Sequence, residues 1–233
     1  MSRGAALESL ASLQDRIINC GLCPRLVEWR EKVAREKVRR FADQEYWGKP
    51  VPSFGDPRAR LLVLGLAPAA HGGNRTGRIF TGDRSGDWLF RALHKAGFAN
   101  QPASVDRNDG LRLRDCYLTA AVRCAPPQNK PLPQENANCR PYLLGELELL
   151  GRVRVIVALG RFAFDAAIAS VGLAEQSSRR PEFKHGVEIR LTQGVTLLAS
   201  FHPSQQNTFT GKLTEPMFDL VFARARKIID DGV

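Results

Sequence analysis

Four short apolar runs stand out along the chain, and in each the apolar residues are continuous rather than alternating. They span Arg60 to Leu66, Tyr117 to Val122, Val153 to Leu159 and Val195 to Ser200. A strand with one face in water alternates apolar and polar residues, whereas a strand covered on both faces is apolar throughout. The pattern therefore predicts four buried strands.

Segments with helical character lie around these runs. They cover Leu7 to Ile18, Pro24 to Arg40, Asp87 to Ala96, Gln134 to Leu150, Arg161 to Val171 and Glu215 to Asp230, with Thr214 placed to cap the last. Strands that alternate with helices predict an α/β fold with a mainly parallel central sheet. No internal repeat, low-complexity tract or domain linker interrupts residues 1–233, so we expect one domain.

Polar, glycine-rich or proline-rich loops follow three of the four predicted strands. They read "APAAHGGNRTG" after the first, "RCAPPQNKPLP" after the second and "FHPSQQNTFTG" after the fourth. In open α/β sheets the ligand crevice lies outside the carboxyl ends of the strands, so these loops predict a site at one edge. The first loop has neither G-x-x-x-x-G-K-[ST] nor G-x-G-x-x-G, which argues against nucleoside triphosphates and dinucleotides as ligands.

The charge balance narrows the class of partner. Lys and Arg number 34 against 24 Asp and Glu, a formal net charge of +10. Such an excess favours a polyanionic partner, most often nucleic acid, although a generally basic protein would show it too. No apolar run is long enough to span a bilayer, and the N-terminus does not resemble a secretory signal, so we expect a soluble, cytoplasmic protein with no membrane partner.

The cysteines suggest a metal or cluster site. Cys20 and Cys23 form a C-x-x-C, Cys124 follows the second strand and Cys139 lies fifteen residues later. In a reducing compartment an odd number of cysteines does not indicate a disulfide framework. Four thiolates could hold zinc or an iron–sulfur cluster, and the residues alone leave both open. The fifth, Cys116, is expected to be a small buried residue.

The stretches "GLAPAAHGGNRTGRIFTGD", "LTAAVRCAPPQNKP" and "SFHPSQQNTFTGKLT", together with the cysteine spacing, resemble the type B (fifth-family) uracil-DNA glycosylases. The likeness is collinear from about Cys20 to the final helix. It implies a single three-layer domain with a central four-stranded parallel sheet flanked by helices. It also implies a structural [4Fe–4S] cluster on Cys20, Cys23, Cys124 and Cys139. The implied partner is DNA that contains uracil or another deaminated base, bound by a monomer that associates with the nucleoid.

The implied reaction flips a base out of the duplex and hydrolyses its N-glycosidic bond, leaving an abasic site. Phe80 matches the aromatic that stacks on the base, although an arbitrary phenylalanine is more often a core residue. His202 would donate a hydrogen bond to the pyrimidine O2, where negative charge collects as the bond breaks.

The residue that orients water or stabilises the sugar cation is less obvious. Positions Ala67, Pro68, Ala69 and Ala70 of the first loop are chemically inert. Asp83 is the best carboxylate and Asn129 the best amide, and both match residues implicated in this family. Asp83 is also placed to cap the helix that starts near Ser85.

The resemblance assigns the remaining candidates to substrate and DNA. The base pocket would include Gly65, Ala67, Pro68, Ala69, His71, Gly72, Phe80 and Asn207, with Asn207 and its neighbours in a loop that enters the duplex. DNA contacts would come from Arg75, Arg78, Lys130, Lys184, His185 and Gln206. Phosphate contacts of this kind position the protein without reading sequence.

Base discrimination is expected to be loose. Fourth-family relatives carry an Asn in the second strand that reads the uracil edge, whereas this chain has Thr119-Ala120-Ala121-Val122. Without that amide we expect removal of uracil, and also of hypoxanthine, xanthine and other damaged bases. The alternative is a non-catalytic iron–sulfur or zinc module that binds nucleic acid. A redox enzyme is disfavoured because no flavin or nicotinamide fingerprint is present.

Overall fold

The computed structural model describes residues 9–174 and 181–232, so the first two residues of the predicted helix at Leu7 to Ile18 lie outside the described part. Its strands are β1 (Phe54–Gly55), β2 (Leu61–Gly65), β3 (Cys116–Ala120), β4 (Val155–Leu159), β5 (Glu188–Arg190) and β6 (Thr196–Ser200). Its helices are α1 (Leu10–Ile18), α2 (Pro24–Glu36), α3 (Gly73–Thr76), α4 (Arg84–Lys95), α5 (Pro133–Leu149), α6 (Arg161–Val171), α7 (Gln205–Phe209) and α8 (Glu215–Asp231). Short 3₁₀ turns lie at Arg39–Phe41, Pro127–Asn129 and Thr192–Gly194.

The strands form one sheet in the order β1-β3-β2-β4-β6-β5. The four strands predicted from the apolar runs are its parallel centre, in register from Leu61 opposite Cys116 to Ala158 opposite Ala199. The described sheet has six strands rather than four, because β1 and β5 add antiparallel edges. These edges are two and three residues long and not fully buried, so they carry no continuous apolar run.

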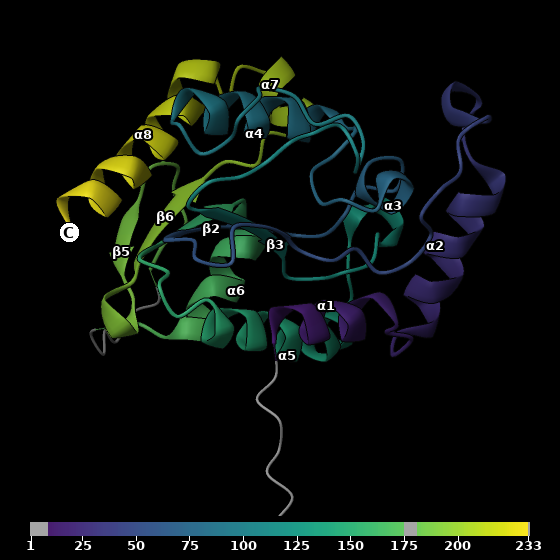
Figure 1. Ribbon diagram of the computed structural model, residues 1–233, viewed down its shortest axis with the longest axis horizontal. Helices are drawn as coiled ribbons and strands as arrows, with labels where there is room; N and C mark the ends of the chain where they lie inside the picture. The colour runs from purple at the N-terminus through teal and green to yellow at the C-terminus, as the bar shows by residue number, and fades with distance from the viewer. Residues whose placement is uncertain (1–8, 175–180, 233) are drawn as a thin grey trace, which may run out of the picture.

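Helices cover both faces of this sheet, which explains why its central strands are apolar throughout. Figure 1 shows α4 and α8 on one side and α1, α5 and α6 on the other. Alternate strand residues enter opposite cores: Leu61 and Val63 pack with α4 and α8, whereas Leu62 and Leu64 pack with α5 and α6. The observed three-layer α/β architecture confirms the predicted fold class.

Capping residues fix several helix ends as predicted. Thr214 accepts the Met217 N–H at the start of α8, and Asp83 accepts the Gly86 N–H at the start of α4. The second predicted helix was too long, because α2 ends at Glu36 and Lys37 follows with φ 53. Among the described residues, no helix is both long enough and apolar enough to cross a membrane.

The strand order places a topological switch point between β2 and β4. The chain leaves β2 for β3 on one side, and β4 then pairs with β2 on its other side. Connections that diverge in this way open a crevice at the carboxyl ends of the two strands. The loop after β2 and the loop after β6 border that edge.

Candidate active site

A cavity of about 540 Å³ opens at this edge of the sheet. It is lined by Leu66, Ala67, Ala69, Phe80, Asp83, Arg84, Ser85, Asn129, His202, Ser204, Gln205 and Gln206. The loops after β2, β3 and β6 all contribute, as the sequence predicts. The cavity therefore gathers the three residues expected to be catalytic, Asp83, Asn129 and His202, together with the aromatic Phe80.

Phe80 lies directly over the last residue of β2. A Cβ at Gly65 would come 2.5 Å from the Phe80 Cζ atom, so only glycine leaves room for the ring. Phe80 itself has φ 53, a left-handed conformation that costs energy for a bulky residue. Its ring is 7% exposed and also touches the core beneath α4. Phe80 therefore lines the cavity and at the same time belongs to the hydrophobic core.

Asp83 lies at the junction of the first loop and α4. Its Oδ1 atom accepts the Gly86 N–H at 3.0 Å, which confirms its place as a helix cap. A Cβ added at Gly72 would collide with Oδ2, so the loop folds its glycine against this carboxylate. Burial raises the pKa of Asp83, although the N–H groups of Gly86 and Ser85 and the charge of Arg75 act in the opposite direction.

His202 follows β6, and its ring contributes to the wall of the cavity. Burial lowers the pKa of His202 to about 4, so the imidazole is neutral at physiological pH and one nitrogen carries a proton. The His202 carbonyl oxygen accepts a hydrogen bond from Asn207 Nδ2 at 2.9 Å. Asn207 therefore holds the loop that carries His202, and its amide does not point into a base pocket.

Asn129 lies on the rim, exposed, with φ 57 on the turn after β3. The end of β3 itself offers no amide to the cavity. Ala120 and Ala121 are buried, and the Thr119 hydroxyl donates to Glu146 Oε2 at 2.6 Å. Asn129 is therefore the one side-chain amide that the loop after β3 brings to the described cavity.

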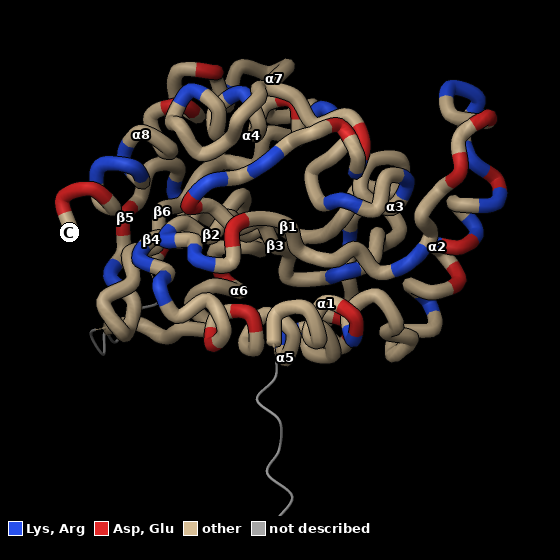
Figure 2. The backbone as a smooth tube through the Cα atoms, in the orientation of Figure 1, with Lys and Arg blue, Asp and Glu red and all other residues tan. Residues whose placement is uncertain are grey.

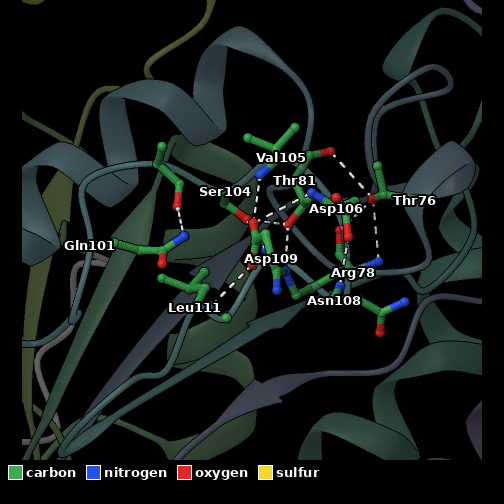
Figure 3. A network of polar contacts seen from close by, with 12 residues as sticks. Thr76, Arg78, Thr81, Gln101, Ser104, Val105, Asp106, Asn108, Asp109 and Leu111 are labelled. Atoms are coloured by element: carbon green, nitrogen blue, oxygen red, sulfur yellow. Dashed lines mark hydrogen bonds and ion pairs between the residues drawn. The ribbon is translucent and has the colours of Figure 1, made fainter.

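Two arginines expected to contact phosphate are held inside the protein. Arg78 is 4% exposed, and its guanidinium bonds to Asp109, Ser104 and Thr81 (Figure 3). Arg75 is 9% exposed, lies over the Phe41 ring and donates to the carbonyl oxygens of its own loop. Their placement corrects that expectation, because both guanidinium groups build the first loop and face away from solvent.

Of the other residues predicted to contact DNA, two lie at or beside the cavity and two are engaged in contacts within the protein. Gln206 lines the cavity and Lys130 is exposed beside Asn129. Lys184 is exposed but pairs with Glu182, and the His185 ring packs on Phe201 with both nitrogens in hydrogen bonds.

Ala67 and Ala69 of the first loop line the cavity, whereas Pro68, His71 and Gly72 are not among its lining residues. His71 Nδ1 is 3.1 Å from the Tyr46 hydroxyl, and Pro68 packs on Gly73.

Several cavity residues were not predicted. Arg84 and Ser85 enter from the first turn of α4, while Leu66 and Ser204 enter from the loops after β2 and β6. For Arg84, Ser85 and Ser204 the only sequence signal is proximity to Asp83 or His202, because arginine and serine are common at the starts of helices; Leu66 is simply the end of the first apolar run. Arg84 also lies over the exposed ring of Phe209, 4.2 Å from its centroid.

The four cysteines expected to hold a cluster converge on a second, small cavity. Cys20, Cys23, Cys124 and Cys139 all line it, with Leu26, Val27 and Pro50 among the apolar neighbours. The described residues do not contain a ready-made group of three or more His, Cys, Asp or Glu in metal-binding geometry. Cys116 is fully buried in β3, away from this cavity, as predicted.

Two buried arginines beside this cavity indicate whether an anionic group would fit there. Arg30 and Arg123 both line it, and the Nε atom of each is buried without a hydrogen-bond partner. Arg30 Nη1 donates to Cys124 Sγ at 3.0 Å. A thiolate-bound iron–sulfur cluster carries sulfur acceptors and negative charge, which would satisfy such donors. The cysteines and their surroundings therefore fit a cluster of this kind.

Comparison with known proteins agrees with the geometry. The family model described as "Uracil DNA glycosylase superfamily" matches residues 52–226 of the chain. A Type-5 uracil-DNA glycosylase of Mycobacterium tuberculosis is 55% identical over 94% of this chain and 82% of its own length. Another from Thermus thermophilus is 51% identical over 98% of this chain and 99% of its own. A Type-4 enzyme of Archaeoglobus fulgidus is 32% identical over 66% of this chain and 70% of its own. The chain therefore belongs to the uracil-DNA glycosylase superfamily and falls among its type-5 members.

Proposed function

We propose that the protein removes uracil from DNA by hydrolysing the N-glycosidic bond and leaving an abasic site. One observation carries this proposal: a single cavity at the sheet edge brings together an aromatic face, a neutral imidazole, a carboxylate and an amide. The relatives named Type-5 uracil-DNA glycosylase, which align over most of the chain, support the same substrate.

The extrahelical base would stack on Phe80. Flipping a base out of a duplex costs a few kcal/mol, and stacking on an aromatic returns about 1–3 kcal/mol. The ring is fixed by its contact with Gly65, so it would meet the base as a rigid wall. A cavity of about 540 Å³ is large enough for a nucleobase with its sugar.

His202 would stabilise the leaving base. As the bond to the sugar lengthens, negative charge accumulates on the base, and a donor aimed at its carbonyl oxygen lowers the barrier. Because the pKa of His202 is about 4, the group is a neutral donor rather than a general acid at physiological pH. Asn207 would position it by holding its carbonyl oxygen.

Asp83 would act on the sugar from which the base departs. The sugar becomes positively charged as the base departs, and a carboxylate beside it favours that charge. Oδ1 of Asp83 is already occupied by the Gly86 N–H, so the carboxylate is fixed in orientation before the substrate arrives. Asn129, on the facing rim, is placed to orient either the base or the attacking water.

We propose further that Cys20, Cys23, Cys124 and Cys139 hold a [4Fe–4S] cluster. Its contribution would be structural, since the cysteines tie the start of α2 to the loop after β3 and to α5. That loop carries Asn129 into the cavity, so the cluster would support the site from behind. The unpartnered Nε atoms of Arg30 and Arg123 support this assignment.

The range of bases is a finer part of the proposal. The Thr119 hydroxyl is occupied by Glu146, and the residues after it are alanines. A buried amide that pairs only with uracil would be left unpaired by any other base, and that cost would exclude the other base. This pocket has no fixed amide at this position, so we expect it to discriminate weakly between bases. Hypoxanthine and xanthine are therefore expected to be removed as well as uracil.

Cleavage of labelled duplexes tests the function. Duplexes with uracil, hypoxanthine or xanthine would be incubated with enzyme, treated with hot alkali and resolved by length. We expect strand breaks at each lesion, with the rate lowered about 100- to 1000-fold by His202→Ala because one transition-state donor is lost. Tight binding without cleavage by the native protein would instead identify a non-catalytic binding module. Strict cleavage of uracil alone would reject the broad base range.

A further inference from the structure

A cavity comparable in size to the candidate active site lies at the opposite end of the parallel strands. Its volume is about 660 Å³, and it is lined by Asp56, Arg58, Arg60, Gly97, Arg114, Asp115, Arg152 and Arg226. Five arginines against two aspartates leave a formal excess of three positive charges. Figure 2 shows basic and acidic segments interleaved beside the β2 and β4 labels.

Both aspartates of this cavity are committed to structural contacts. Asp115 accepts the Arg60 backbone N–H and guanidinium, and also contacts Arg226 Nη1 at 3.4 Å. Asp56 accepts the N–H of Arg58 through Oδ1 and the N–H of Asp115 through Oδ2, each at 2.9 Å. Their oxygens are therefore occupied, and they fix the loops that form the floor.

Two of the arginines are explained by the fold. Helices that run antiparallel to the strands end at this edge, where their free carbonyl groups attract cations. Arg226 donates to the Ala96 carbonyl oxygen after α4, and Arg60 donates to Ile229 near the end of α8. Helix termini therefore account for Arg60 and Arg226.

The other three arginines have no such role. The side chains of Arg58, Arg114 and Arg152 are exposed, and none makes a hydrogen bond or ion pair within the described residues. Burial would raise the pKa of Asp56, but its N–H partners and the charges of Arg58 and Arg152 lower it on balance, which shows that both guanidinium groups act on this one spot.

The positions of these arginines bring them close together. Arg58 lies in the loop before β2, Arg114 just before β3 and Arg152 in the loop before β4. These three strands are neighbours in the order β3-β2-β4, and adjacent strands are about 4.8 Å apart. The three arginines, whose side chains have no hydrogen bond or ion pair in the described part of the chain, therefore extend from loops whose strands lie within about 10 Å of one another. Such a focus of charge suits a compact, multiply charged anion, because planar guanidinium groups bind phosphate oxygens in pairs.

We propose that this cavity is a second ligand site, which binds the diphosphate or triphosphate group of a small phosphorylated ligand. Its place at the amino ends of the strands separates it from the loops around His202. The proposal is independent of the glycosylase activity, because none of the three arginines touches the candidate active site.

Calorimetric titration with inorganic pyrophosphate tests the site. The native protein should bind it, and R58Q/R152Q should raise the Kd at least about tenfold, because two charge-assisted contacts are lost. R35Q/R39Q, which removes two exposed arginines elsewhere, serves as the matched control and should bind as the native protein does. The thermal midpoint should be unchanged, since neither Arg58 nor Arg152 holds a structural contact. The single variant R114Q gives a second route and should also weaken binding.

Uracil excision measured in parallel should be equal in all three variants, which separates this site from the proposed reaction. Titration with an undamaged duplex identifies the source of the phosphate. If the duplex binds the native protein and R58Q/R152Q equally, the site takes a small ligand. If pyrophosphate fails to bind, binds R58Q/R152Q as tightly as the native protein, or if R58Q/R152Q weakens the duplex alone, the proposal is overturned.

Discussion

The tip of the Phe80 ring lies over Gly65, the last residue of β2, so closely that a Cβ at Gly65 would come 2.5 Å from Cζ. A glycine at the end of a buried strand therefore fixes where the aromatic wall of the cavity stands. Gly65→Ala should displace that ring or the strand beneath it. Because small misplacements of a positioned group are costly, we expect kcat/KM for uracil excision to fall about 10- to 100-fold.

Gly151→Ala is the control for this substitution. A Cβ there meets only the Glu148 carbonyl oxygen, at 4.0 Å, so the added methyl group has room. Steady-state excision should be unaffected. Equal activity of Gly65→Ala and the native enzyme would show that the Phe80 ring does not need its observed position.

Substitutions of Asp83 separate its cap from its charge. Asparagine caps helices as well as aspartate does, so Asp83→Asn should keep the Gly86 contact and remove only the negative charge. Since burial raises the pKa of Asp83, removing the charge also relieves a desolvation cost, and the thermal midpoint should not fall. Single-turnover excision should drop at least about 100-fold if the charge stabilises the sugar cation.

Asp83→Ala removes both functions and provides the comparison. It should lose the same activity and, in addition, about 1 kcal/mol of the free energy of unfolding, because α4 loses its cap. The two variants are compared by chemical denaturation and single-turnover kinetics. Full activity in Asp83→Asn would restrict Asp83 to a structural role.

The sequence predicts the parallel centre of the sheet and the edge at which the site forms. Continuous apolar runs arise only where both faces are covered, and the unusual loops follow those runs directly. It does not predict β1 and β5, because pairing of two or three residues depends on backbone contacts with a neighbour rather than on an apolar pattern. Element type is thus encoded locally, whereas the sheet edges are decided by tertiary contacts.

The candidate site shows the same division. Phe80, Asp83, Asn129 and His202 all line the cavity at the predicted edge, since the loops that carry them follow predicted strands. Arg78 lies inside the protein instead of on the predicted DNA surface. The sequence does not reveal this, because it does not show which carboxylate will lie next to an arginine in the fold. The ion pair of Arg78 with Asp109 spans 31 residues, and it lowers the pKa of that carboxyl, which burial alone would raise, to about 2.

The half-buried ring of His202, which its surroundings desolvate, should make stability depend on pH. In the unfolded chain the imidazole takes up a proton below its ordinary pKa of 6.5, whereas in the folded protein it does so only near 4. The stabilisation is thus complete above pH 6.5 and is lost as the pH falls toward 4. By linkage it amounts to about 3 kcal/mol, and His202→Gln should lack it. Urea denaturation of both proteins between pH 7 and pH 4.5 measures the difference, and parallel pH profiles would contradict the desolvation of this ring.

The cysteine cavity makes a prediction that does not depend on catalysis. Arg30 donates to Cys124 Sγ, and its Nε atom is buried without a partner. Arg30→Gln should remove a positive charge beside the proposed cluster, making the cluster harder to reduce and faster to lose to a chelator. Arg123 is a poorer choice for this test, because its loss would leave the buried Glu146 carboxylate without its charged partner.

Arg35→Gln on the same helix is the control, since Arg35 is exposed and does not line the cavity. Iron content, visible absorption and the rate of iron release are compared for the three proteins. Identical release from Arg30→Gln and the native protein would show that this guanidinium does not contact the bound group. Absence of iron from all three would instead reject the cluster itself.

Phe209 is exposed to 66% at the end of α7, next to the rim formed by Gln205 and Gln206. Arg84, which lines the same cavity, lies 4.2 Å from the centroid of this ring. Beside the proposed base pocket, an exposed aromatic would offer a stacking surface to the DNA around an extruded nucleotide. Phe209→Ala should therefore weaken binding of a uracil-containing duplex by about 1–3 kcal/mol.

Leu220→Ala gives a matched control, because Leu220 is a comparably exposed apolar residue, 69% exposed, on α8. Its loss should leave duplex affinity unchanged. Fluorescence anisotropy at a fixed salt concentration measures both, since phosphate contacts make affinity depend strongly on salt. A stacking contact is largely insensitive to salt, so Phe209→Ala should shift the binding curve without altering its salt slope. A change in that slope would mean that the substitution acts through Arg84 and the phosphate backbone rather than through the lost ring.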